Sequence, residues 1–357
     1  MLLEILQAAL AFDRISRVTV LASPAARRQF EMPASPKLQV VDVPKAESSV
    51  GRLLWALQGL DRAASRLNPD VLLGFNGIGT VRPDRRFASL VFVQQPVPYS
   101  REALRRFPQP MRLRMAVIGW VTRRSTKAAD HVLVQTDVMR QTLVRAFGLP
   151  LERISVFLPG APLLPPPRDF PKLRAVLADA RNGILLYAGS ESPHKNLIVV
   201  ARGLQLVPPA VRPKWLVTLP ESSGLCRRSG AVGLGHLPKA ELHAAYRAAS
   251  VLVMPSLTET VGLPMLEAMR AGTPVLAADR PYAHEVCEDA AVFFDPLSPA
   301  DFADKLTRLL GDAALQADLV ARGHALVRRR DAQDVYRAMV ERVGEGGRGG
   351  QEAEVRR

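Results

Sequence analysis

Two patterns of apolar residues alternate along the chain. Short runs rich in β-branched residues are bounded by turn-forming residues, and longer segments repeat apolar residues every three or four positions. Such alternation is typical of βα units that build parallel sheets covered by helices. The predicted strands are 17–21, 38–42, 71–74, 90–93, 131–135 and 154–157, followed by 184–188, 215–219, 251–254, 275–278 and 291–294.

A proline-rich stretch divides the two sets of strands. Residues 158–170 read LPGAPLLPPPRDF, which is too stiff and too poor in N–H donors for a core element. We therefore predict an α/β protein with two doubly wound domains and a ligand cleft at the carboxyl ends of their strands. The predicted parts are a first domain at 1–158, a linker at 159–170, a second domain at 171–328, a closing crossover helix at 329–343 and a disordered tail at 344–357.

Composition fits two globular domains and points to an acidic partner. The 357 residues are 48% hydrophobic, which excludes a disordered chain. The net charge is +14, of which residues 1–165 carry +11 and residues 166–357 carry +3. An anionic membrane, a nucleic acid or a phosphorylated acceptor would each suit a basic first half.

Cysteine usage and the first residues indicate a cytoplasmic protein. Cys226 and Cys287 form no CxxC or Cys/His cluster, so the sequence supports neither a disulfide framework nor a structural zinc site. The start carries Glu4 and Asp13 and has no basic leader, which argues against a signal peptide. No apolar run is long enough to span a membrane.

The segment 256–273, SLTETVGLPMLEAMRAGT, lies between two predicted buried strands and holds two carboxylates eight residues apart, Glu259 and Glu267. That spacing alone carries little weight. Its context carries more, because Gly262 and Pro264 predict a helix start whose free N–H groups face the strand ends and suit an anion. The alternative is a solvated glutamate that only offsets the helix dipole.

A second polar loop, in residues 186–197 (LYAGSESPHKNL), follows another predicted strand. Lys195 stands near the start of the next helix, where one ammonium group can hold a phosphate. The alternative is an ordinary surface lysine. By the same reasoning the neighbouring His194 is a turn residue.

Taken together, the segments GSESPHKN, GHLPKAELHAAYRAASVLVMPS, TETVGLPMLEAMRAGTPVLAAD and AAVFFDP resemble the donor domain of the retaining family 4 glycosyltransferases, which have the GT-B fold. The resemblance covers residues 130–330 and keeps the family's order and spacing. It implies two Rossmann-like domains facing a cleft. It also implies transfer of a sugar from a nucleoside diphosphate with retention at the anomeric carbon.

The resemblance also assigns roles to residues. Glu259 would lie near the donor sugar, Glu267 would bind the ribose, Lys195 would hold the diphosphate, and Gly262 and Leu263 would offer backbone N–H groups. Lys195 and Glu259 are thus the predicted catalytic groups, acting by charge stabilisation and orientation, with no metal, no other cofactor and no assigned nucleophile. Further predicted donor-binding residues are Gly189, Ser190, Asn196, Leu237 and Thr260, and predicted acceptor-side residues are Asn76, Gln94 and Gln95.

Three departures from the family pattern stand out. Ser190 occupies a position where many relatives have Arg, which leaves Lys195 as the clear cation of its loop. Gln94 or Gln95 stands where many relatives have His, and an amide can hydrogen-bond but supplies no charge. The chain also begins at a helical pattern where the family has a strand and a glycine-rich loop, so either the start is recorded late or the first domain lacks its usual first strand and this loop.

The basic excess of the first half concentrates in residues 99–127. Arginines alternate there with apolar residues including Trp120, and Pro108 and Pro110 divide the stretch into two helical pieces. Such a segment can dock on anionic lipid. The alternative is that residues 115–120 belong to the core and the arginines are solvated.

These features lead to one expected function and several rivals. We expect a glycosyltransferase that is peripheral on the inner face of the plasma membrane and acts in surface polysaccharide synthesis. Its PHKN-type loop favours a GDP-mannose-like donor, and its acceptor would be a glycan or a lipid-linked sugar. A catalytically silent partner subunit is the main alternative. A nucleic-acid-binding protein is a remote one, because no reading motif is present, and no GxGxxG supports an oxidoreductase.

Overall fold

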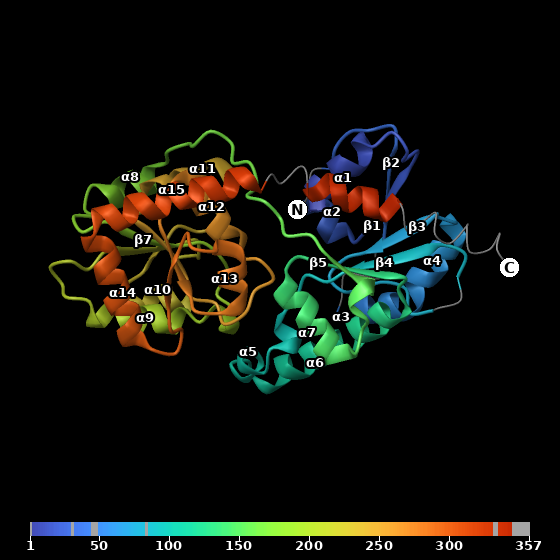
Figure 1. The fold of residues 1–357 in the computed structure, drawn as a ribbon, viewed down its shortest axis with the longest axis horizontal. Helices are drawn as coiled ribbons and strands as arrows, with labels where there is room; N and C mark the ends of the chain where they lie inside the picture. Colours follow the sequence, from blue (N-terminus) through green and yellow to red (C-terminus); the bar gives the residue numbers. More distant parts are fainter. Residues whose placement is uncertain (1, 30–31, 44–48, 83–84, 331–334, 345–357) are drawn as a thin grey trace. The chain divides into compact units, whose positions relative to one another are not determined.

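The computed structural model describes residues 2–29, 32–43, 49–82, 85–330 and 335–344 (Figure 1). Its contacts divide the chain into two units. The first unit comprises Met1–Tyr99, Leu113–Pro159 and Gln333–Arg357, and the second comprises Ser100–Arg112 and Gly160–Ala332. Each unit is α/β with parallel strands, which confirms the predicted fold class.

The first unit holds two parallel sheets. β1 (Val18–Ala22) pairs with β2 (Leu38–Asp42), and a four-stranded sheet has the order β3-β4-β5-β6. Those strands are β3 (Val71–Gly74), β4 (Ala88–Phe92), β5 (His131–Val134) and β6 (Ile154–Val156). The helical elements are α1 (Leu2–Ala11), α2 (Pro24–Gln29), α3 (Ser49–Leu54), η2 (Trp55–Gly59), α4 (Leu60–Leu67), η3 (Val97–Tyr99), α6 (Gln109–Ala128), α7 (Asp137–Phe147), η4 (Leu151–Arg153) and residues 335–344. The first turn of α6, up to Arg112, belongs to the second unit.

The second unit is built on one parallel sheet with the strand order β12-β11-β10-β7-β8-β9. The strands are β7 (Ile184–Tyr187), β8 (Lys214–Val217), β9 (Val232–Gly233), β10 (Val251–Met254), β11 (Val275–Ala278) and β12 (Val292–Phe294). The helical elements are α5 (Arg101–Arg105), α8 (Pro171–Leu177), η5 (Pro193–Lys195), α9 (Leu197–Leu206), α10 (Gly224–Ser229), α11 (Lys239–Ala248), α12 (Leu263–Ala271), α13 (Pro281–Cys287), α14 (Pro299–Gly311) and α15 (Ala313–Arg329). In Figure 1, α11, α12 and α15 lie on one side of this sheet, and α9 and α14 lie on the other.

The centre of this sheet is wholly apolar because it is covered on both faces. Every residue of β7, β10 and β11 is buried. Helices α9 and α14 approach closely at Gly203, where a Cβ atom would lie 2.8 Å from the backbone oxygen of Pro299 and 2.3 Å from the ring of Phe302. A small residue is therefore required where these two helices cross.

The predicted strands are confirmed to within one or two residues at each end. The sequence missed β9, which is only two residues long and so shows no periodicity. Pro108 separates α5 from α6, as predicted for the basic segment, whereas Pro110 does not interrupt a helix but stands in the first turn of α6. One assignment differs from the domains drawn from the sequence, because Ser100–Arg112 lies within the range 1–158 yet belongs to the second unit.

The proline-rich linker forms no helix or strand, but it packs along the second unit. Arg270 donates to the carbonyl oxygen of Ala161 at 2.8 Å, and His243 Nδ1 lies 2.7 Å from the carbonyl oxygen of Pro165. Near the other end of the chain, α15 ends at Arg329 and the helix 335–344 belongs to the first unit, and the crossover helix at 329–343 stays a prediction. The predicted disordered tail falls, apart from Gly344, outside the described residues.

Candidate functional site

The loops that follow β7 and β10 form one end of the site. These strands are neighbours and run parallel, so their carboxyl ends meet at the same edge of the sheet. The backbone N–H of Leu257 donates to the carbonyl oxygen of His194 at 2.9 Å. This bond joins the loop that bears Lys195 to the loop that bears Glu259.

Lys195 and Glu259 form a direct ion pair. Lys195 Nζ lies 2.5 Å from Glu259 Oε1, and the two side chains are only 16% and 13% exposed. Partial burial strengthens the interaction relative to a surface pair, because less water screens it. The short turn η5 presents the lysine, and Asn196 ends this turn in the left-handed conformation with φ of 53°. Lys195 thus stands near the start of α9, as predicted, and belongs to the turn that precedes this helix.

The N-terminus of α12 faces the same edge of the sheet. Gly262 precedes the helix with φ of 78° and ψ of 55°, a left-handed conformation that favours glycine. A Cβ atom there would also lie 2.8 Å from Met265 Cε. Pro264 stands in the first turn, where no N–H is needed, so the remaining free N–H groups can bind an anion.

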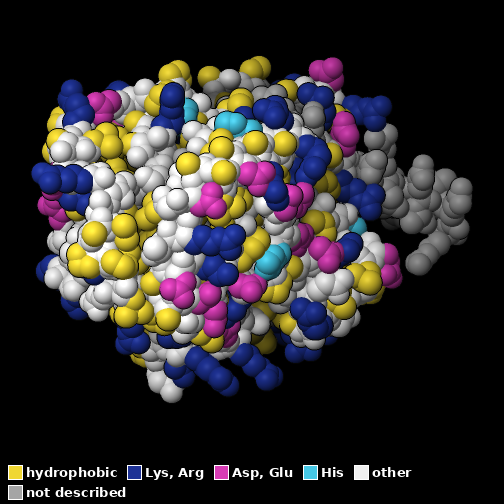
Figure 2. All heavy atoms as spheres, turned by 60° about the vertical axis from the view of Figure 1, so that its left-hand side comes forward, with side chains coloured by type: hydrophobic (Ala, Val, Ile, Leu, Met, Phe, Trp, Pro, Cys, Tyr) yellow, Lys and Arg dark blue, Asp and Glu magenta, His cyan; other side chains and the backbone are white. Residues whose placement is uncertain are grey.

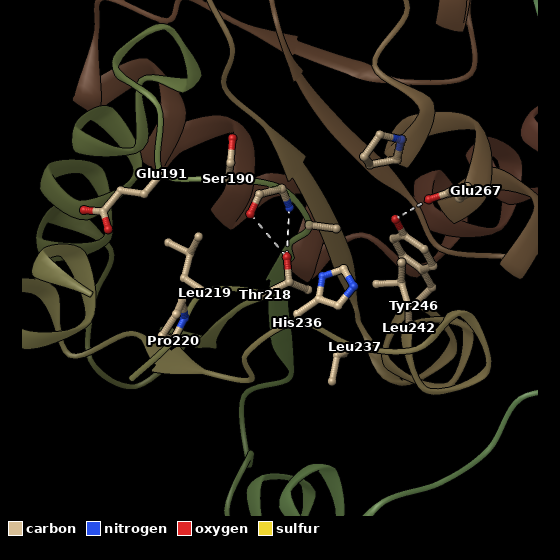
Figure 3. A pocket seen from close by; sticks show the side chains of 13 residues that line it. Ser190, Glu191, Thr218, Leu219, Pro220, His236, Leu237, Leu242, Tyr246 and Glu267 are labelled. Atoms are coloured by element: carbon tan, nitrogen blue, oxygen red, sulfur yellow. Dashed lines mark hydrogen bonds between the residues drawn. The ribbon is translucent and has the colours of Figure 1, made fainter. Parts of the chain in front are cut away.

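A pocket of about 570 Å³ opens at these strand ends (Figure 3). It is lined by Ala188, Gly189, Ser190, Glu191, Thr218, Leu219, Pro220, His236, Leu237, Leu242, Tyr246, Pro264 and Glu267. Figure 3 shows Glu267 and Tyr246 at one end and Glu191 and Pro220 at the other. Among these lining residues no Lys or Arg occurs, so Lys195 stands outside the pocket wall.

Glu267 is oriented by Tyr246 at one end of this pocket. The Tyr246 hydroxyl donates to Glu267 Oε2 at 2.7 Å, as the dashed line in Figure 3 marks. Burial and the nearby Glu267 carboxylate raise the pKa of Tyr246 well above its usual value. The phenol therefore stays protonated at neutral pH and remains a hydrogen-bond donor to Glu267.

Thr218, directly after β8, fixes the loop that follows β7. The backbone N–H of Gly189 donates to Thr218 Oγ1 at 2.9 Å, and the Tyr187 hydroxyl donates to the carbonyl oxygen of Ser190 at 2.8 Å. A Cβ atom on Gly189 would lie 2.6 Å from the Tyr187 hydroxyl oxygen. The loop therefore needs a glycine at this position to pass over β7.

The structure brings together most of the predicted donor-site residues. Four of them line the pocket, namely Gly189, Ser190, Leu237 and Glu267. The others stand on the adjoining loops after β7 and β10 and at the start of α12, namely Lys195, Asn196, Glu259, Thr260, Gly262 and Leu263. Their roles in binding a donor stay predictions.

The predicted acceptor-side residues lie in the first unit. Asn76 follows β3 with φ of 54° and is exposed, and Gln94 and Gln95 follow β4. The N–H of Gly77 donates to the carbonyl oxygen of Phe92 at 2.9 Å, so these two strand-end loops lie side by side. Their role in binding an acceptor stays a prediction.

Sequence reasoning missed two tyrosines at the site, one that donates to Glu267 and one that holds the loop after β10. Tyr246 lies on α11 within the motif HAAYRAAS, where its spacing indicates only a buried helix face. Tyr282, on α13, donates to the carbonyl oxygen of Ser256 at 2.9 Å. Burial, followed by the charge of Glu259, raises the pKa of Tyr282, so it remains a neutral donor. Only the three-dimensional contacts reveal either role.

Metal binding finds no positive support in the described part of the chain, where no group of three or more His, Cys, Asp and Glu side chains is placed to hold an ion. Independence from metal therefore remains a prediction. Figure 2, which turns the left-hand side of Figure 1 towards the viewer, shows Lys and Arg interspersed with Asp and Glu on this face.

Two family models match the chain in tandem. Residues 170–325 match the model described as glycosyl transferases group 1, and residues 5–160 match the glycosyl transferase 4-like domain. The chain belongs to the GT-B glycosyltransferases. These matches favour the glycosyltransferase interpretation over the oxidoreductase and nucleic-acid alternatives.

Curated proteins that are similar to this chain carry the names of two different glycosyltransferase activities. It is 29% identical over 221 residues to the O-antigen chain mannosyltransferase B of Escherichia coli, covering 56% of this chain and 57% of that protein. It is 32% identical over 238 residues to the D-inositol 3-phosphate glycosyltransferase of Xylanimonas cellulosilytica, covering 60% and 56%. The chain thus spans a little over half the length of these relatives.

Solved structures share the fold of this glycosyltransferase. WaaG, a glycosyltransferase involved in lipopolysaccharide biosynthesis, superposes with a TM-score of 0.71 at 17% identity over 96% of this chain and 94% of that one. HepE of Anabaena, solved in complex with UDP-glucose, gives a TM-score of 0.65 at 18% identity over 96% and 95%. Both likenesses concern the GT-B fold.

Proposed function

We propose that this protein transfers a sugar from a nucleoside diphosphate donor to a glycan or lipid-linked acceptor, with retention at the anomeric carbon, as in family 4. The observation that carries the proposal is the Lys195–Glu259 pair on the two loops beside the pocket that holds Glu267. A cation, a helix N-terminus and a carboxylate that can accept ribose hydroxyls are then available on one edge of one sheet.

The residues act on the donor in distinct ways under this proposal. Lys195 and the N–H groups at the start of α12 stabilise the negative charge that develops on the leaving diphosphate, so no metal is required. Glu259 holds the ammonium of Lys195 until the donor arrives and then orients the sugar. Glu267 binds the ribose. No residue is assigned as a nucleophile.

We further propose a GDP-mannose-type donor and a role in surface polysaccharide synthesis. The PHKN-type loop supports this donor, and so does the similarity to an O-antigen mannosyltransferase. HepE binds UDP-glucose, so UDP-sugars are the competing donors to test.

Nucleotide binding is testable by thermal shift. We expect one of UDP, GDP, ADP and TDP, added without metal, to raise the melting temperature, because a ligand that binds only the folded state stabilises it by about 2.7 kcal/mol at 100 times its Kd. We expect Glu267→Ala to weaken this binding roughly tenfold or more, since a hydrogen bond to a charged group is lost. The measurement is the nucleotide Kd of each variant.

Asp304→Ala is the matched control, because Asp304 is an exposed carboxylate of the same unit on α14 and lies outside the pocket. It should bind nucleotide like the wild type. If a folded wild-type chain binds none of the four nucleotides, the donor-site proposal fails, and a catalytically silent partner subunit becomes the better interpretation.

We also propose that α6 docks this enzyme on the anionic inner face of the plasma membrane. Leu113 is 69% exposed and Trp120 is 47% exposed, and seven residues, nearly two turns, separate them on one face of the helix. The guanidinium of Arg124 lies 5.2 Å from the Trp120 ring centroid. The buried residues of α6 begin only at Val121, which argues against the alternative that residues 115–120 belong to the core.

No helix in the described ranges is both long enough and apolar enough to cross a bilayer. Vesicle sedimentation tests the proposed docking of α6 on an anionic membrane. We expect Trp120→Glu to weaken binding to phosphatidylglycerol-containing vesicles several-fold, because an anchor is lost and a repelled charge is added. Leu151→Glu is the control, since Leu151 is 49% exposed in η4 of the same unit. Equal binding by wild type and Trp120→Glu would contradict a docking role for α6.

A further inference from the structure

The segment Ser100–Arg112 packs on the second unit although its neighbours in sequence belong to the first. Its own residues order it locally. Ser100 caps α5 by accepting from the N–H of Ala103 at 3.2 Å, and Arg112 donates to the carbonyl oxygens of Phe107 and Arg105 at 2.7 Å. Arg112 thus bonds carbonyl groups at the end of α5 and just after it, within the same segment.

Two side chains fasten this segment to loops at the strand ends. Phe107 is 7% exposed, and its ring stacks on the imidazole of His194 with centroids 6.0 Å apart and an interplanar angle of 19°. Glu102 accepts from Arg280 at 2.7 Å, directly after β11. The segment thus contacts both the loop after β7 and the loop after β11.

His194 is held on three sides and stands directly before Lys195. Its Nδ1 lies 2.9 Å from Ser192 Oγ, its carbonyl oxygen accepts from Leu257, and Phe107 covers its ring. Burial lowers the pKa of His194, so the ring is neutral near pH 7 and adds no charge beside Lys195. Because η5 is only three residues long, the position of His194 determines that of Lys195.

We infer that the segment Ser100–Arg112 is a positioning element for the donor phosphates, in which Phe107 acts through His194 to hold Lys195 in place. This inference rests on the proposed function. Phe107 is a positioning residue, since it packs on the loop and touches none of the reacting groups. The cation of the donor site is then set in place by a residue 88 positions earlier in the chain, within the half that carries the acceptor-side loops.

Amide hydrogen exchange of the nucleotide-free protein tests whether Phe107 holds the loop that bears His194 and Lys195. We expect Phe107→Ala to speed exchange in residues 192–197 about three- to tenfold, the effect of losing one aromatic pair. Phe107→Tyr, which keeps the ring, should restore the wild-type rate. Phe170→Ala is the control, because Phe170 is 9% exposed in the same unit and begins α8 instead of contacting this loop.

A double-mutant cycle with GDP and with UDP tests the route through Lys195. Phe107→Ala should raise the nucleotide Kd about three- to tenfold in the wild-type background and leave it unchanged in the Lys195→Ala background. Glu102→Gln, which weakens the second attachment, should act in the same direction with a smaller change. It also serves as the test if Phe107→Ala does not fold.

The outcomes separate this inference from the proposed function. Unchanged exchange at 192–197 in both Phe107→Ala and Glu102→Gln overturns the positioning role, whether or not nucleotides bind. Equal loss of affinity with and without Lys195 overturns the route through Lys195. Faster exchange in a chain that binds neither GDP nor UDP supports the positioning role of this segment for the loop 192–197 but contradicts the proposed donor site.

Discussion

Lys195→Ala should lower the rate of sugar transfer by about 10²–10³-fold, the usual cost of removing one group that stabilises transition-state charge. Lys195 stands in a partly buried pair with Glu259, so its charge is little screened by solvent. Glu259→Gln should cause a comparable loss, because the amide keeps the shape but no longer pairs with the ammonium. The measurement is release of nucleoside diphosphate from the nucleotide sugar, with and without acceptor.

Lys214→Ala is a matched control for this prediction. Lys214 also forms an ion pair in the second unit, with Asp179, but it lies at the amino end of β8, away from the carboxyl ends that form the site. Its variant should keep wild-type turnover. If Lys195→Ala and Glu259→Gln are folded and turn over donor at near wild-type rates, the catalytic assignment is wrong.

Phe302→Ala should lower the free energy of unfolding of the second unit by about 3–5 kcal/mol, as large-to-small core substitutions do. Phe302 is fully buried and meets Phe294 edge-on with centroids 5.1 Å apart. It also fills the space above Gly203, so its loss leaves a cavity that α9 and α14 cannot easily close. Urea unfolding followed by the fluorescence of Trp215, a residue of the same core, measures the change.

Phe293→Ala is the control for the packing prediction. Phe293 precedes Phe294 on β12 but is only half-buried, with its ring 3.9 Å from that of His284. Its removal should cost clearly less than that of Phe302, because less apolar surface is returned to water and no closed cavity forms. Equal losses would contradict the placement of Phe302 at the centre of the core.

The sequence predicted local elements well because local physics determines them. Strands such as β7 and β10 are continuous apolar runs between turn residues, so their type and approximate ends follow from pattern alone. The two-residue β9 has no pattern to detect. The separation of α5 from α6 followed from Pro108, since proline restricts the backbone before it and lacks an N–H.

By itself, the sequence determined the fold class, the strand-end loops and the residue types that suit a phosphorylated donor. Only the tertiary structure decided that Lys195 pairs with Glu259, that Tyr246 orients Glu267, and that Ser100–Arg112 packs with the second unit. Each of these depends on contacts between residues that are far apart in the chain. The separation is 21 positions for Tyr246 and Glu267, 64 for Lys195 and Glu259, and 87 for Phe107 and His194. Such contacts leave no periodicity in the sequence, because they arise only when the parallel strands bring distant loops to one edge of a sheet.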